Sequence, residues 1–255
     1  DVKLAWNKCE EVLNNLVVSI THDECVDERD EVEENGWIGN VIMGHSSGAH
    51  VALLMLVDMI GGWMSKNDEA EATMITNSSS GSSNSKYPWT PHYFVGLSGP
   101  YDISYHFDYE AGRGVEQISP MKPACGHTRD NFHKASPVKR LLSLFGKQRI
   151  EEKEAMSDRA TSIQQLTPPI LLVHGIEDST VPFTATSDAA RTLRSCGLKV
   201  CDEVYLEETT HQDVIMHFML GGVARDVVMD WLLLQQQCRR NRQQQRWEVE
   251  LQSRL

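Results

Sequence analysis

Short continuous apolar runs alternate along the chain with longer runs of helical spacing. Three short runs are typical of buried strands, and they cover residues 38–43, 93–99 and 168–175. A last strand is expected at residues 201–207. Helical spacing predicts helices at residues 47–59, 184–196 and 223–236, the first ending at Gly61-Gly62. This alternation predicts an α/β fold, doubly wound around a mostly parallel sheet.

The segments between these runs define the expected domain organisation. Residues 77–86 are rich in serine and should form a disordered surface insertion. Residues 101–165 are irregular, with helical character only near residues 138–145, and they directly follow a predicted strand, which favours a lid over a site. We therefore expect one domain over residues 1–236 and a polar tail over residues 237–255.

Composition narrows the classes of partner. With 40% hydrophobic and 24% charged residues, the chain of 255 residues is typical of a globular protein. Its formal net charge of −12 disfavours nucleic acid and anionic membranes as partners, which leaves neutral or cationic small substrates. No apolar run reaches the roughly 18 to 20 residues that span a bilayer.

The six cysteines lack the C-x-x-C spacing of zinc or redox sites, so no metal or other cofactor is predicted. Reduced thiols in a cytosol-facing or endomembrane-associated protein are the favoured interpretation, and disulfide pairing in a secretory lumen stays open. The chain begins at Asp1 without an initiator methionine or a signal peptide, so we expect the natural chain to start upstream.

The pentapeptide Gly44-His45-Ser46-Ser47-Gly48 lies between a predicted strand and a predicted helix. This is the setting of a nucleophile elbow, in which a serine occupies a sharp, strained turn with its hydroxyl exposed. Glycines at both ends would remove Cβ atoms that clash in such a turn. Ser46 is therefore the candidate nucleophile, and an ordinary turn serine is the structural alternative.

An acyl-transfer serine needs a base and an acid that orients the base. Ser46, Asp178 and His211 follow one another in the order of α/β-hydrolases, and both partners fall just after predicted strands. A turn-forming acid and an exposed loop histidine are the structural alternatives for Asp178 and His211. The competing candidates are Glu177 for the acid and His174, His217 and His45 for the base.

Other residues near the elbow are expected to complete the site. The backbone N–H of Ser47, at the helix N-terminus, should supply one oxyanion donor. A second donor normally comes from a His-Gly-Gly loop, and residues 1–40 contain none. His45, Ser98 and Gly99 are expected to line the substrate pocket.

With these residues in place, the chain resembles the α/β-hydrolase esterases related to hormone-sensitive lipase and kynurenine formamidase, and within them the isoprenylcysteine methylesterases. The stretches that carry the resemblance are Gly44-His45-Ser46-Ser47-Gly48-Ala49-His50, Tyr93-Phe94-Val95-Gly96-Leu97-Ser98-Gly99, His174-Gly175-x-x-Asp178-x-x-Val181-Pro182 and Thr210-His211-Gln212-Asp213. The resemblance implies a sheet of about eight strands. It also implies that the first half, with the oxyanion loop, precedes Asp1, and that any membrane anchor lies in a segment that this chain lacks.

The expected function is a serine carboxylic-ester hydrolase acting on a small-molecule or lipidated-cysteine ester, most specifically the methyl ester of a prenylcysteine. An arylformamidase, which would use the same three residues on an N-formyl group, is the alternative among enzymes. An alternative from another class is a catalytically impaired, hydrolase-like binding protein, or a truncated product, because the oxyanion loop is missing.

Overall fold

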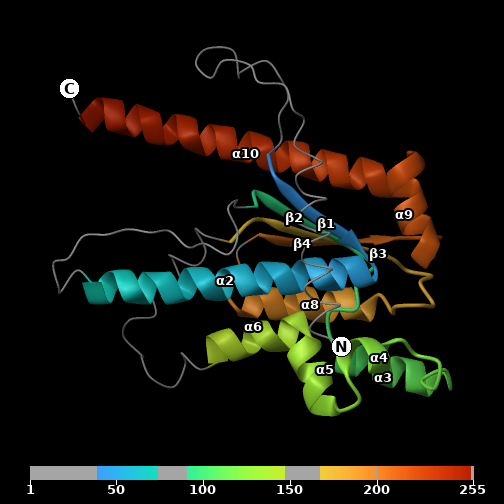
Figure 1. Ribbon diagram of the computed structural model, residues 1–255. Helices are drawn as coiled ribbons and strands as arrows, with labels where there is room; N and C mark the ends of the chain where they lie inside the picture. The colour runs from blue at the N-terminus through green and yellow to red at the C-terminus, as the bar shows by residue number, and fades with distance from the viewer. Residues whose placement is uncertain (1–38, 74–90, 147–166, 199, 254–255) are drawn as a thin grey trace, which may run out of the picture.

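The computed structural model describes residues 39–73, 91–146, 167–198 and 200–253. Within these residues, four strands form one sheet in the order β1-β2-β3-β4, and every neighbouring pair is parallel. The strands are β1 (Val41–His45), β2 (Tyr93–Leu97), β3 (Ile170–Gly175) and β4 (Cys201–Leu206). Because all four run the same way, their carboxyl ends share one edge of the sheet, where ligands bind in open parallel sheets (Figure 1).

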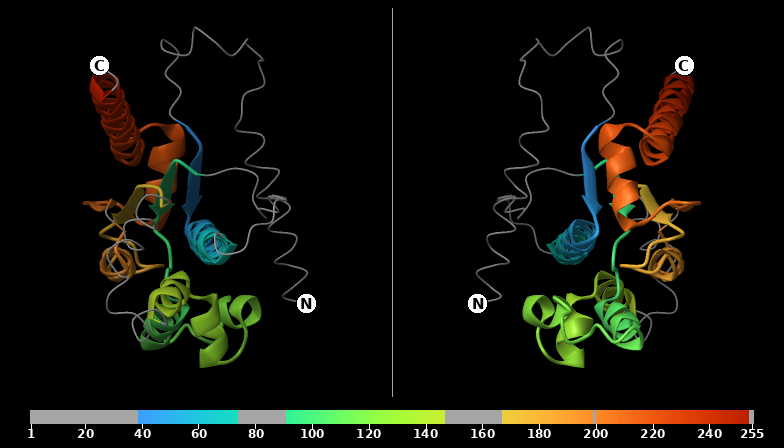
Figure 2. Two further views of the ribbon diagram at one scale, coloured as in Figure 1. Left: turned by 90° about the vertical axis from the view of Figure 1, so that its left-hand side faces the viewer. Right: turned by 90° about the vertical axis from the view of Figure 1, so that its right-hand side faces the viewer.

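Helices cover both faces of the sheet (Figures 1 and 2). One face carries α2, α6 and α8, and the other carries α9 and α10. The helices are α2 (Ser47–Thr73), α3 (Ile103–Gly112), α4 (Met121–Cys125), α5 (Arg129–Ala135), α6 (Pro137–Gly146), α8 (Thr184–Ser195), α9 (His211–Leu220) and α10 (Val223–Ser253). This arrangement confirms the predicted α/β class with a doubly wound parallel sheet.

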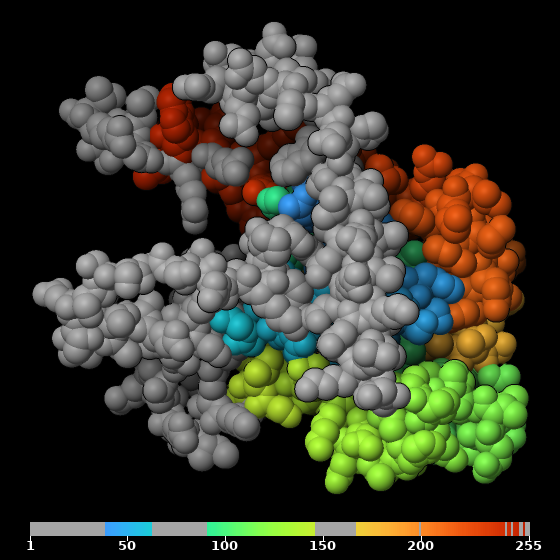
Figure 3. Space-filling model, viewed as in Figure 1, coloured from blue at the N-terminus to red at the C-terminus, as the bar shows by residue number. Residues whose placement is uncertain are grey.

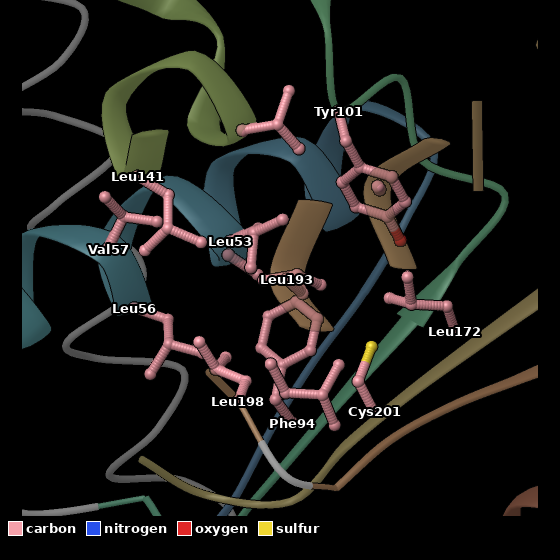
Figure 4. Close-up of a cluster of buried hydrophobic side chains, with 14 of the residues drawn as sticks. Leu53, Leu56, Val57, Phe94, Tyr101, Leu141, Leu172, Leu193, Leu198 and Cys201 are labelled. Atoms are coloured by element: carbon pink, nitrogen blue, oxygen red, sulfur yellow. The ribbon is translucent and has the colours of Figure 1, made fainter. Parts of the chain in front are cut away.

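Alternate strand residues enter two separate cores. Phe94 and Leu172 point to the α2 side, where they meet the buried leucines of α2 and α8 (Figure 4). Val95 and Val173 belong to the opposite cluster, beneath α9 and α10. Each large apolar side chain that is fully buried stabilises the fold by about 1.5–3 kcal/mol. Burial on both faces is why these strands are continuous apolar runs rather than alternating ones.

Two helices are longer than predicted. Helix α2 continues through Gly61 and Gly62 to Thr73, so the predicted end at the glycine pair is wrong. Neither glycine has a positive φ, and a glycine inside a helix costs only about 1 kcal/mol relative to alanine. Helix α10 runs to Ser253, so residues 237–253 of the expected polar tail continue it, because their Gln, Arg and Glu residues favour helix.

The segment after β2 contains more helix than predicted. Residues 101–146 form α3, α4, α5 and α6, whereas helical character was expected only near residues 138–145. Two N-caps explain the difference. The Asp102 carboxylate accepts hydrogen bonds from the N–H groups of Ser104 and Tyr105, and the Thr128 hydroxyl accepts one from the N–H of Asn131. Residues 147–165 of the expected lid and the insertion at 77–86 lie outside the described residues.

Candidate active site

The elbow has the geometry of a strained strand-to-helix turn. Ser46 has φ 56°, a left-handed conformation that is rare for a residue with a side chain, and its N–H donates to the carbonyl of Leu97 at 2.8 Å. A Cβ atom at Gly44 would lie 2.4 Å from the carbonyl carbon and oxygen of Gly48. A Cβ at Gly48 would meet nothing within 4 Å, so the expected clash exists only at Gly44.

Backbone contacts join the segments that follow β3 and β4. The N–H of Ile176 donates to the carbonyl of Leu206 at 2.9 Å, and the N–H of Glu177 donates to the carbonyl of Thr209 at 3.1 Å. Gly175 allows this approach, because a Cβ there would lie 2.2 Å from the Thr209 oxygen. These contacts bring the segment that carries Asp178 against the one that carries His211.

Asp178 and His211 form a buried hydrogen-bonded pair. His211 Nδ1 lies 2.6 Å from Asp178 Oδ2, while Asp178 Oδ1 accepts from the N–H groups of Thr180 and Val181, each at 2.8 Å. Burial by itself would raise the pKa of Asp178. Hydrogen bonds from His174, His211 and Val181 outweigh it, and the net pKa is well below the ordinary aspartate value. The carboxylate is therefore ionised at neutral pH.

His211 is the first residue of α9, so it lies on a helix and is not an exposed loop histidine. The Asp213 carboxylate accepts from the N–H of Thr210 at 3.0 Å and from its hydroxyl at 2.6 Å. A Thr-x-x-Asp sequence is a helix-start signal of the capping-box type, so the sequence carried the information that would have placed His211 on a helix.

The competing residues occupy other positions. Glu177 is exposed, and His217 lies further along α9. His174 is fully buried at the end of β3, with Nδ1 2.7 Å from the Thr186 hydroxyl and Nε2 2.9 Å from the Val181 carbonyl. His174 Nε2 also lies 3.1 Å from Asp178 Oδ2, so this histidine is a second imidazole in contact with the carboxylate, besides His211.

His45 lies directly against His211. Its Nε2–H donates to the His211 carbonyl at 2.9 Å, and the two ring centroids are 4.7 Å apart. Burial lowers the pKa of His45. The residue before the candidate nucleophile is thus a neutral donor that holds the backbone of the candidate base.

Three further predicted site residues have defined surroundings. Ser47 is the first residue of α2, so its N–H has no acceptor within the helix. Ser98 is fully buried with φ 49°, and its hydroxyl has no hydrogen-bond partner within the described part of the chain. Gly99 makes room for the ring of Tyr101, which a Cβ would approach to 2.5 Å. Their roles as oxyanion donor and pocket lining stay predictions.

Ser46 Oγ makes no hydrogen bond to any of the residues described, so the triad also stays a prediction. The elements that carry the candidate triad come together at one edge of the sheet: Figure 3 shows the start of α2 between α9 and the α3–α5 segment.

The α3–α5 segment carries two titratable residues that were not predicted from the sequence, the buried His106 and the half-buried Glu110. The sequence signal for this pair is the spacing of four residues between His106 and Glu110, in a helix that Asp102 caps at its N-terminus.

The described residues contain neither a metal-ligand cluster nor a membrane-spanning helix. In residues 39–73, 91–146, 167–198 and 200–253, no three His, Cys, Asp or Glu side chains are grouped as metal ligands. Over the same ranges, no helix has the length and apolarity to cross a bilayer. The cysteines at 125, 196, 201 and 238 are free thiols, and Cys9 and Cys25 lie outside the described residues.

The sequence is similar to plant methylesterases. It is 27% identical over 189 residues to a probable isoprenylcysteine alpha-carbonyl methylesterase of Oryza sativa subsp. japonica, covering 74% of this chain and 38% of that protein. It is 28% identical over 189 residues to an isoprenylcysteine alpha-carbonyl methylesterase of Arabidopsis thaliana, covering 74% of this chain and 36% of that protein. The match thus spans little more than a third of these relatives. No family model matches the sequence.

Solved structures with a related shape include two esterases. A truncated form of a carbohydrate esterase from gut microbiota has 16% identity and a TM-score of 0.46, covering 76% of this chain and 59% of that one. Esterase 2 of Thermogutta terrifontis, phosphoramylated by tabun, has 15% identity and a TM-score of 0.38, covering 76% of this chain and 51% of that one.

Proposed function

We propose that this chain carries the catalytic residues of a serine carboxylic-ester hydrolase, with Ser46 as nucleophile, His211 as base and Asp178 as the acid that orients it. The observation that carries the proposal is the 2.6 Å contact between His211 Nδ1 and buried Asp178, at the sheet edge where Ser46 occupies a strained turn. Strain of this kind concentrates at functional sites, and a buried, ionised carboxylate on Nδ1 leaves Nε2 free to accept a proton.

The reaction follows from these positions. His211 Nε2 takes the proton of the Ser46 hydroxyl as Oγ attacks the carbonyl carbon of the ester, and Asp178 stabilises the imidazolium that results. His211 then protonates the departing alkoxide, which leaves an acyl group on Ser46. Water attacks this acyl-enzyme with His211 again as base, releasing the carboxylic acid and restoring the serine.

The developing oxyanion faces the start of α2, where the Ser47 N–H is an available donor. Loss of one oxyanion donor typically lowers turnover about 100- to 1000-fold. A His-Gly-Gly sequence, the usual source of the second donor, is absent from residues 1–40.

The substrate class that we propose is the methyl ester of a prenylated cysteine or a similar hydrophobic ester. Its support is the similarity to proteins named isoprenylcysteine alpha-carbonyl methylesterases. The net charge of −12 accords with a neutral or cationic ester rather than an anionic one.

The test is labelling by a fluorophosphonate probe together with turnover of p-nitrophenyl acetate. Wild type should be labelled at Ser46, Ser46→Ala should lose both labelling and turnover, and Ser47→Ala should keep both because its donor is a backbone N–H. An unlabelled wild type that is well folded would favour a non-catalytic, hydrolase-like binding protein. Cleavage of N-formylkynurenine in preference to a prenylcysteine methyl ester would favour an arylformamidase.

A further inference from the structure

His174, the last residue but one of β3, is buried between the start of α8 and the candidate acid. Its Nδ1 lies 2.7 Å from the hydroxyl of Thr186 on α8. Its Nε2 lies 2.9 Å from the Val181 carbonyl and 3.1 Å from Asp178 Oδ2. The side chains of His174 and Asp178 are both 0% exposed. This histidine is therefore in direct contact with the residue that orients the proposed base.

The partners of His174 determine which of its ring nitrogens carries the hydrogen. The Val181 carbonyl can only accept, and so can the ionised carboxylate of Asp178, so Nε2 must carry the hydrogen and donate. A donor that faces two acceptors forms a three-centre hydrogen bond. Nδ1 is then an acceptor, and the Thr186 hydroxyl donates to it. Both ring nitrogens of His174 are thus satisfied, as burial requires.

Asp178 receives donors on both of its carboxylate oxygens. Oδ1 accepts from the backbone N–H groups of Thr180 and Val181. Oδ2 faces His211 Nδ1 at 2.6 Å and His174 Nε2 at 3.1 Å. The terminal torsion of an aspartate side chain is broad, so bonds to Oδ1 alone would leave Oδ2 free to swing. Within the described part of the chain, His174 is the side chain that can hold Oδ2 besides the proposed base itself.

We propose that His174 is a positioning residue of the proposed hydrolase, whose Nε2–H holds Asp178 Oδ2 in the direction of His211 Nδ1. It acts through the carboxylate and transfers no proton in the reaction. The inference rests on the proposed function and adds a fourth side chain on which that function depends. The pKa of Asp178 agrees with it: burial by itself would raise this pKa, and the hydrogen bond from His174 is the largest of the effects that lower it.

A purely structural role is the alternative, because the same N–H also ties the Val181 carbonyl to the end of β3. His50 provides a matched comparison. It is 8% exposed, and its Nε2 lies 2.7 Å from the Ala135 carbonyl, so it is a buried histidine that holds the backbone of another element. His50→Leu removes a carbonyl contact of the same kind without removing a donor to Asp178.

The kinetic test is p-nitrophenyl acetate turnover by His174→Leu and His174→Gln. Leucine removes the N–H, so Oδ2 is no longer held, and kcat should fall about 10- to 100-fold while KM stays within about twofold. Glutamine can place an amide N–H near the position of Nε2, so it should return kcat to within about threefold of wild type. His50→Leu should also keep kcat within about threefold of wild type, although it should lower the free energy of unfolding.

NMR of the histidine rings tests the contact without turnover. In wild type, the ¹⁵N shifts should show the hydrogen of His174 on Nε2, and the Nδ1–H signal of His211 should lie far downfield because it faces a carboxylate at 2.6 Å. The His211 signal should move upfield and broaden in His174→Leu, because Oδ2 then swings away from Nδ1. It should keep its position in His174→Gln and in His50→Leu.

Three results would overturn the positioning role: a hydrogen on Nδ1 of His174, an unchanged His211 signal in His174→Leu, or no recovery of kcat with glutamine. If His174→Leu does not fold, His174→Asn takes its place, because its amide is too short to reach Oδ2 and should lower kcat in the same way. Failure of the proposed hydrolase is a separate result. Wild type would then not be labelled by fluorophosphonate, while the NMR signals would still report the contact between His174 and Asp178.

Discussion

Replacing Asp178 with asparagine changes one atom at the centre of the site. Oδ1 accepts from two backbone N–H groups, of Thr180 and Val181, so the new side chain keeps its oxygen there. Its NH2 group then occupies the position of Oδ2, facing Nδ1 of His211. An amide NH2 only donates, so His211 must present Nδ1 as an acceptor and carry its proton on Nε2.

The expected cost is large because this tautomer cannot remove a proton from Ser46. The same exchange in serine proteases lowers kcat by about 10⁴, and we expect a similar loss in p-nitrophenyl acetate turnover by Asp178→Asn. A 10⁴-fold loss in kcat corresponds to about 5 kcal/mol of transition-state stabilisation. Labelling of Ser46 by fluorophosphonate should slow by a similar factor, because it also needs the activated hydroxyl.

Glu177→Gln is the matched control, since it removes an adjacent carboxylate that is exposed. It should keep turnover within about threefold of wild type, because surface charges contribute little. The assignment of the acid is refuted if Asp178→Asn keeps turnover within tenfold of wild type, or if Glu177→Gln loses as much. Circular dichroism of each variant would separate a local effect from unfolding.

Two other outcomes can be checked by urea unfolding. Gly44→Ala should lower the free energy of unfolding by more than about 3 kcal/mol, because its Cβ would lie 2.4 Å from backbone atoms. Gly48→Ala should leave the free energy of unfolding unchanged or raise it by up to about 1 kcal/mol, because alanine has the higher helix propensity. Equal losses in the two variants would contradict the elbow geometry. The pKa of Asp178 is lower in the folded protein than in the unfolded chain, where it is about 3.9. The ionised carboxylate therefore stabilises the fold above that pH, and this contribution is lost as the pH falls toward the pKa of the folded state. The gap in unfolding free energy between wild type and Asp178→Asn should therefore narrow from about pH 6 to about pH 3, and a constant gap would contradict it.

Much of the fold could be predicted because parallel strands have a strong sequence signal. Residues 170–173 are an uninterrupted apolar run, and the structure buries all four in β3 between two layers of helices. The elbow could be located from the sequence because so sharp a turn requires a residue without a Cβ atom at position 44. Placing Asp178 and His211 at one edge needed only the rule that parallel strands end together.

Other features depend on tertiary contacts or on competing local signals. Gly61 and Gly62 looked like a helix end, but the packing of α2 on the sheet outweighs their weak helix propensity. The sequence shows Glu110 one turn after His106, but it does not show the proximity of Asp178 and His211, which lie more than 50 residues further along the chain. Polar residues of α3 gave no apolar stripe, so its cap at Asp102 was the only available signal.

His45 and Ser46 are consecutive residues, and His45 holds the carbonyl of a residue 166 positions further along the chain. The proposed nucleophile and base are therefore linked by one peptide bond and one hydrogen bond, rather than through the three strand pairings between β1 and β4. We expect this link to keep the two groups together when the sheet flexes, so that thermal motion between the strands changes their separation little.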